Sequence, residues 1–128
     1  MNENLKKYFR RLLKKRKNKE QLTSSEEWLY NLCEKNIQDK CKEFEIDDFV
    51  YESWVPTLIK EIKTAGLKKF VVTDRSNILM EVIHNLEKEG FKMMRLFTIE
   101  RIPNQSEEKE VQSINGVMFM SVKSRNSQ

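Results

Sequence analysis

The sequence predicts an α+β fold in which helices come first and an α/β-like half follows. Apolar residues recur at helical spacing in the first half of the chain, whereas short apolar and β-branched runs flank a helical pattern in the second half. We expect N-terminal helices, then helix–strand–helix–strand–strand around a small three-stranded mixed sheet. A length of 128 residues has room for one such domain. We divide it into a basic amphipathic helical arm, residues 1–19, and a single α+β domain, residues 20–128.

The first helix is predicted over residues 5–17. Apolar residues recur from Leu5 at i, i+3, i+4, i+7 and i+8, which is one stripe on a helix. Asn2 or Asn4 can cap its start. The other faces of this helix are basic and carry Lys6, Lys7, Arg10, Arg11, Lys14, Lys15, Arg16 and Lys17.

A second helix is predicted over residues 24–44, where Ser24 and Glu27 have the spacing of a capping box. Cys33 and Cys41 lie eight residues apart on it. At ~1.5 Å rise per residue their separation is about 12 Å, too far for a disulfide. We therefore expect two reduced thiols.

Residues 45–52 are acidic and aromatic and fit either a short helical turn or an extended linker. A third helix should follow, with Ser53 as its N-cap and Pro56 tolerated in its first turn. Gly66 should be the residue just beyond its C-terminus.

The remaining elements alternate between strand and helix patterns. We predict a buried strand over 70–73, a helix over 77–89 and a strand over 91–102. The two strands should run parallel, because a helix connects them. A polar loop over 103–115 should then lead to an antiparallel strand over 116–123.

Charge is unevenly distributed along the chain, whose formal net charge is +4. Residues 1–19 hold nine Lys and Arg against one Glu, whereas residues 20–59 hold three against ten Asp and Glu. Such asymmetry indicates electrostatic partners. Alternatively, the arm packs on the acidic residues of its own chain.

Several classes of function are disfavoured by composition. Three isolated glycines exclude the P-loop and the dinucleotide fingerprint. One histidine and two cysteines make a zinc site improbable, and no nucleophile–base pair can be assembled, so we expect no cofactor and no enzymatic activity. No apolar run approaches the ~18 residues of a membrane span, and the N-terminus lacks a signal-peptide pattern. We expect a cytoplasmic protein.

Three groups of residues are candidates for binding. The basic arm could contact phosphates, an anionic membrane or an acidic protein. Arg75 and Ser76, between a strand and a helix, could hold an anion. The favoured alternative is that Asp74 or Ser76 caps the helix and Arg75 is solvated. Acidic and aromatic side chains alternate in a third group, which either docks on a basic surface or forms part of the core and its solvated rim. This third group consists of Glu45, Asp47, Asp48, Tyr51, Glu52 and Trp54.

A family resemblance adds a biological setting. The residues that carry it are Glu45-Ile46-Asp47-Asp48-Phe49, Ala65-Gly66, Phe70, Thr73-Asp74-Arg75-Ser76, Met80-Glu81, His84, Gly90-Phe91 and Thr98-Ile99-Glu100-Arg101. Over residues 44–122 the chain resembles a family of small Firmicutes proteins from conjugative plasmids, transposons and phages. The resemblance implies a mobile-element setting, where small proteins include host-defence inhibitors, notably anti-CRISPR proteins, and DNA-processing accessories.

These observations predict a non-enzymatic binding protein of a mobile element. It would inhibit host defence by stoichiometric occlusion of a nucleic-acid-binding surface, with a CRISPR effector nuclease and its guide RNA as the partner. The alternative is a nucleic-acid-binding accessory or regulatory protein that uses the basic arm.

Overall fold

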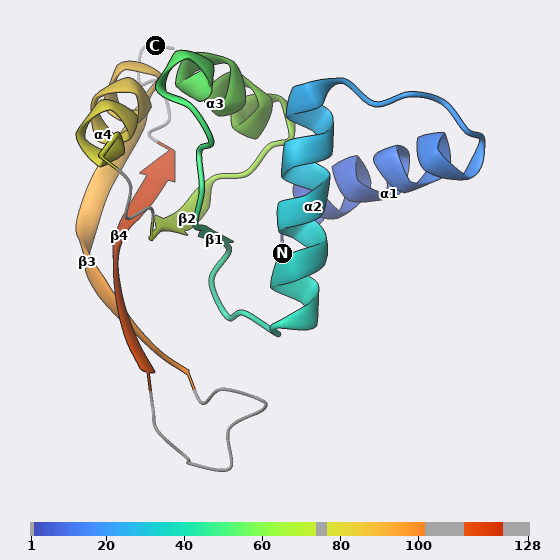
Figure 1. The fold of residues 1–128 in the computed structure, drawn as a ribbon. Coiled ribbons are helices and arrows are strands. Elements are labelled where there is room, and N and C mark those ends of the chain that lie inside the picture. The colour runs from blue at the N-terminus through green and yellow to red at the C-terminus, as the bar shows by residue number, and fades with distance from the viewer. Residues whose placement is uncertain (1, 74–76, 102–111, 122–128) are drawn as a thin grey trace, which may run out of the picture.

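The computed structural model describes residues 2–73, 77–101 and 112–121 and confirms the predicted α+β class (Figure 1). The helices are α1 (Glu3–Lys17), α2 (Ser24–Gln38), α3 (Val55–Thr64) and α4 (Leu79–Lys88), with a short 3-10 helix, η1 (Glu52–Trp54), before α3. The strands are β1 (Glu45–Ile46), β2 (Lys69–Val72), β3 (Phe91–Arg101) and β4 (Gln112–Ser121).

The sheet has four strands in the order β1-β2-β4-β3, so the prediction of three strands was wrong. The strand that was missed is β1, which pairs in parallel with β2. Two residues are too few to show the alternation by which a strand is recognised in a sequence. Strand β4 is antiparallel to both β2 and β3, so β2 and β3 run in the same direction, as predicted.

The core lies between the helices and one face of the sheet. Phe70 of β2 stacks on Phe119 of β4, with ring centroids 6.0 Å apart, and its ring meets Phe91 of β3 edge-on at 5.2 Å. Helices α3 and α4 cover these rings with apolar side chains that are fully buried, namely Leu58, Ile59, Ile62, Val82 and Leu86. The β3–β4 ribbon extends away from the helices (Figure 1).

Helix α2 differs from its prediction at both ends. Its capping box is formed by Thr23 and Glu26, one residue earlier than predicted. The helix ends at Gln38 rather than at residue 44, and Lys40 adopts a φ of +52° just beyond it. Cys41 therefore lies outside the helix, and the single-helix argument about the two cysteines was wrong. Both residues are nonetheless reduced cysteines, as predicted.

The start of α3 also differs, since η1 precedes it and Ser53 is not its N-cap. Pro56 does lie in the first turn, as predicted. Gly66 follows the helix with a φ of +76°, and a Cβ at this residue would come within 2.6 Å of the Cβ of Asn4. The end of α3 is thus held against the start of α1, where the side chain of Asn2 donates to the Gly66 carbonyl at 3.1 Å.

The boundaries of the C-terminal elements shift by a few residues. Strand β4 begins at Gln112, inside the segment predicted to be a loop. The rest of that loop lies outside the described residues. Strand β3 contains a bulge between Met93 and Arg95, which breaks strict side-chain alternation. No helix among the described residues combines the length and the apolar character that a membrane crossing requires.

Candidate binding surfaces

Helix α1 packs on the body of the protein through its apolar stripe. Its N-cap is Asn2, whose side chain accepts a hydrogen bond from the Leu5 N–H at 2.8 Å. Leu5, Tyr8 and Leu12 are buried in the main core. The Tyr8 hydroxyl donates to Glu61 of α3 at 2.5 Å, and burial followed by this bond raises the pKa of Tyr8. The inner face of α1 is therefore part of the fold.

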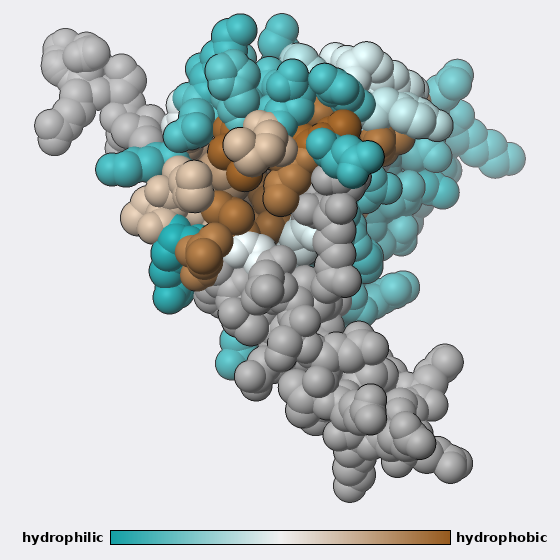
Figure 2. Space-filling model, turned by 60° about the vertical axis from the view of Figure 1, so that its left-hand side comes forward, coloured by the Kyte–Doolittle hydropathy of each residue, from teal (hydrophilic) through white to brown (hydrophobic). Residues whose placement is uncertain are grey.

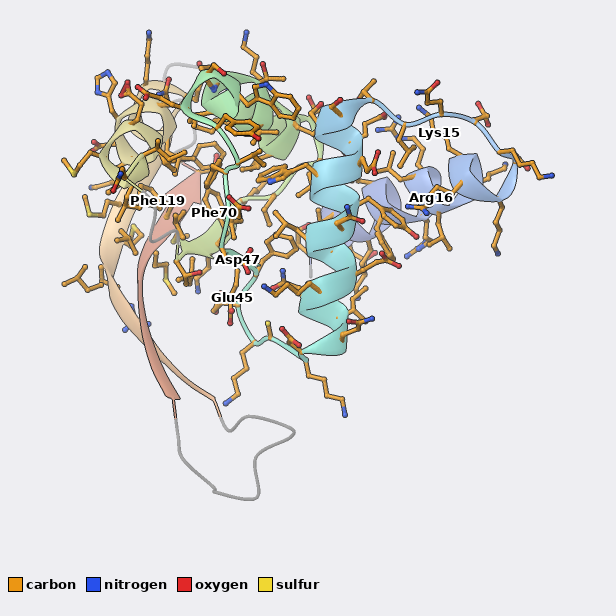
Figure 3. All side chains as sticks on the ribbon, viewed as in Figure 1. Lys15, Arg16, Glu45, Asp47, Phe70 and Phe119 are labelled. Carbon is orange, nitrogen blue, oxygen red and sulfur yellow. The ribbon has the colours of Figure 1, made fainter. Side chains whose placement is uncertain are left out.

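The cations at the sides of α1 make contacts within the chain. Arg11 and Lys15 approach the Glu26 carboxylate at 4.0 and 3.4 Å, and the Arg16 guanidinium lies 4.8 Å from the centre of the Tyr30 ring (Figure 3). Lys6 pairs with Glu3 at 3.8 Å within the first turns. Four of the eight predicted basic residues thus have partners in their own chain.

Glu26 of α2 is the acidic residue that pairs with Arg11 and Lys15 of α1. Its carboxylate accepts the Thr23 N–H at 2.9 Å, and this bond, followed by the bond from Lys15, lowers the pKa of Glu26. The carboxylate therefore serves two purposes, because it closes the α2 capping box and holds Lys15 of α1.

The other four cations form an exposed row that we call the outer basic stripe: Lys7, Arg10, Lys14 and Lys17. Their spacing of i, i+3, i+7 and i+10 places them on one face of α1 over about 15 Å. Among the residues that the structure describes, none forms an ion pair with these side chains. The stripe thus presents four positive charges on a helix whose opposite face is buried in the core.

The first half of the acidic–aromatic segment is engaged within the molecule. Asp47 forms an ion pair with Lys35 of α2, and half-buried Glu45 belongs to β1 (Figure 3). The Asp48 side chain accepts the Val50 N–H at 2.7 Å, while its carbonyl accepts the Trp28 indole N–H at 2.8 Å. These three predicted site residues therefore have structural contacts.

Val50 marks the change from the inner to the outer half of this segment. Its φ of +64° is unusual for a β-branched residue and costs about 1–3 kcal/mol. The preceding residue, Phe49, anchors this strained backbone. Phe49 is fully buried and packs on Trp28 with ring centroids 5.4 Å apart. The turn directs the chain outward at Tyr51.

The second half of the segment presents aromatic rings to solvent. Tyr51 is 65% exposed and Trp54 is 41% exposed, and their rings meet edge-on with centroids 6.1 Å apart. Glu52, between them, is also exposed. These three predicted site residues are on the surface, as a docking role requires.

An open groove lies beside these residues, between η1 and α4. The sequence did not indicate its α4 side, Glu81 and Asn85. These residues lie 25 to 34 positions after the residues of the other side, and only tertiary packing brings the two sides together. The described residues that line it are Tyr51, Glu52, Ser53, Pro56, Glu81 and Asn85.

An apolar patch was also not predicted (Figure 2). Leu96 of β3 is 79% exposed and Met80 of α4 is 75% exposed, and Met93 and Met94 are exposed as well. The bulge in β3 contributes to the patch, because it pairs Met93 with Phe119 and Leu96 with Val117 and so places both side chains on one face of the sheet.

The Cys33 side chain is fully buried in the core. Burial raises the pKa of the Cys33 thiol to about 12, which keeps it protonated at neutral pH. Among the described residues, no three His, Cys, Asp or Glu side chains gather as metal ligands would. The possible anion site at Arg75 and Ser76 lies outside the described residues.

Residues 28–121 match a protein family described as Domain of unknown function (DUF7698). The chain belongs to this family. The matched range contains η1, α4 and the whole sheet, whereas α1 precedes it. The groove is therefore part of the DUF7698 domain, and the outer basic stripe is carried by an additional helix packed on that domain. No curated protein and no solved structure matches the chain.

Proposed function

We propose that the protein is a non-enzymatic binding protein of a mobile element that contacts nucleic-acid phosphates through the outer basic stripe of α1. The observation that carries this proposal is the exposed row of Lys7, Arg10, Lys14 and Lys17, which form no ion pair with any described residue, on a helix whose opposite face is buried. Fixed cations bind phosphates and release counterions. The nucleic acid is either free or held by a nuclease.

The burial of the inner face argues against a membrane surface as the target. An interfacial helix inserts its apolar face into the lipid. In α1, Leu5, Tyr8 and Leu12 already pack in the protein core and cannot insert while the fold is intact. We place the protein in the cytoplasm, where nucleic acid is accessible.

The test compares two variants of equal charge by fluorescence anisotropy with a labelled DNA duplex and a labelled single-stranded RNA. In one, the four stripe residues are replaced by Gln. In the control, four exposed lysines on other elements are replaced by Gln: Lys60, Lys68, Lys88 and Lys92. We expect the stripe variant to lose roughly a hundredfold in affinity at 0.1 M salt and the control to lose far less. Equal losses would contradict a defined stripe.

A second candidate function is docking on a basic protein surface through Tyr51, Glu52 and Trp54. Its support is the exposure of both rings beside a carboxylate, since aromatic anchors dominate many interfaces. In a mobile element, the partner we propose is a host-defence nuclease of the CRISPR effector type, occluded at the channel that holds its nucleic acid. The groove lies beside α4 while α1 packs on α2, so the two candidate surfaces are separate (Figure 1).

Substitutions at two acidic positions test the docking candidate. Glu52→Lys should weaken capture of a purified effector nuclease, because it places like charges across the interface. Asp47→Lys is the comparison, because Asp47 is already paired with Lys35 and should affect folding more than capture. Nuclease treatment of the sample separates protein docking from bridging by nucleic acid. Unchanged capture by Glu52→Lys would remove this surface from the mechanism.

A further inference from the structure

The groove between η1 and α4 has the chemistry of a site for a cation. Glu52 and Glu81 contribute carboxylates from its two sides, and no lysine, arginine or histidine in the described part of the chain lines it. Among the described residues, none forms an ion pair with either carboxylate. The negative charge of the groove is therefore available to a ligand.

The other lining side chains include hydrogen-bond acceptors and an aromatic ring. The Asn85 amide group donates to the Glu81 carbonyl at 2.8 Å, which leaves the Asn85 side-chain oxygen as an acceptor. Tyr51 is 65% exposed, so most of its ring is open to a ligand. The strained turn at Val50, closed by the Asp48 carboxylate, fixes the direction in which the chain reaches Tyr51. The groove is thus formed before any partner arrives.

We propose that this groove accepts an arginine side chain presented by a protein partner. A guanidinium can stack on an aromatic face and donate to two carboxylates through its planar fork, whereas an ammonium lacks this flat shape. The proposal rests on the docking candidate and names the group that the docking surface recognises. It is independent of the outer basic stripe.

The open shape of the groove sets the expected affinity. One side chain in an open groove binds weakly, so the arginine acts as an anchor within a larger interface. An isolated arginine group should still bind detectably, with a dissociation constant on the order of millimolar.

The experiment is a titration of the isotope-labelled, full-length protein with N-acetyl-arginine amide, followed by two-dimensional NMR. The lysine and citrulline analogues serve as controls, since citrulline keeps the shape of arginine without its charge. We expect saturable shifts at the amides of Tyr51, Glu52 and Glu81 and at the Trp54 indole with arginine. We expect at least about tenfold weaker binding with lysine and no saturation with citrulline.

Protein variants separate this proposal from general charge effects. Glu52→Gln combined with Glu81→Gln should weaken arginine binding about tenfold or more, whereas Glu87→Gln, exposed on α4 outside the groove, should not. Equal binding of citrulline, equal binding of lysine, or the absence of saturable shifts at the groove would each overturn the arginine assignment. Arginine binding in the groove without capture of a nuclease would retain the site and overturn only the nuclease partner.

Discussion

The basic helix α1 and the acidic segment from Glu43 to Trp54 are both densely charged and have opposite signs. Their charged side chains nevertheless lie in different surroundings in the structure. In the acidic segment, Glu43 pairs with Lys69 at 3.4 Å and Asp47 pairs with Lys35. In α1, the outer basic stripe has no described ion-pair partner. Both regions use part of their charge within the fold, but the remaining cations of α1 form one row on a single exposed helix face.

The reason for this difference is the direction of the side chains. A helix with one apolar stripe buries that stripe and turns the opposite side to solvent, so the outer cations of α1 are exposed. The acidic segment crosses the protein as β1 and a turn, where side chains on both sides meet α2 and β2. Only after Val50 does this segment leave the body of the protein. The net charge of a segment therefore does not measure its capacity to bind.

The largest expected effect tests the claim that α1 is part of the folded domain. Leu12 is fully buried, so Leu12→Ala should lower the free energy of unfolding by about 2–5 kcal/mol. Urea denaturation measures this, with exposed Lys14→Ala as the control that should change little. An unchanged unfolding midpoint for Leu12→Ala would mean that α1 is a detached arm.

A smaller effect is expected at Glu26, which connects α1 to α2. Glu26→Ala removes half of the capping box and the partner of Lys15, and it should cost about 1–2 kcal/mol at pH 7. Chemical denaturation of both proteins measures the difference.

The pH dependence at Glu26 follows from its lowered pKa. A carboxyl whose pKa is lower in the folded state contributes stability above its unfolded pKa and loses it as pH falls through its folded pKa. The stability difference between the wild-type protein and Glu26→Gln should therefore shrink below about pH 4. A difference that stays constant from pH 7 to pH 3 would show that charge at Glu26 contributes nothing.

The smallest expected effect concerns the turn at Val50. Glycine adopts a positive φ without strain, so Val50→Gly should stabilise the protein by about 1 kcal/mol after the entropy cost of glycine. Val50→Ala removes only the part of the strain that β-branching adds, so it should stabilise the protein less than Val50→Gly. Thermal unfolding of both variants distinguishes them, and a destabilised glycine variant would show that the Val50 side chain matters more than its backbone.

The sequence predicted features that depend on local pattern. The amphipathic stripe from Leu5 marked the buried face of α1, and Gly66 marked the end of α3. It did not predict β1, because two residues carry no period. It also did not predict that Lys35 would neutralise Asp47 or that Glu81 would face η1, because these contacts arise only when distant segments pack together. Half of the acidic–aromatic residues selected from sequence are consequently structural.

The most direct test of the central claim is the salt dependence of nucleic-acid binding by the unmodified protein. Each phosphate contact contributes about −0.9 to the slope of log K against log salt for duplex DNA, so four stripe cations predict a slope of about −3 to −4. Replacing Lys7, Arg10, Lys14 and Lys17 with Gln should bring the slope close to zero. A slope near zero for the unmodified protein, or an unchanged slope in the variant, would contradict the role of the outer basic stripe.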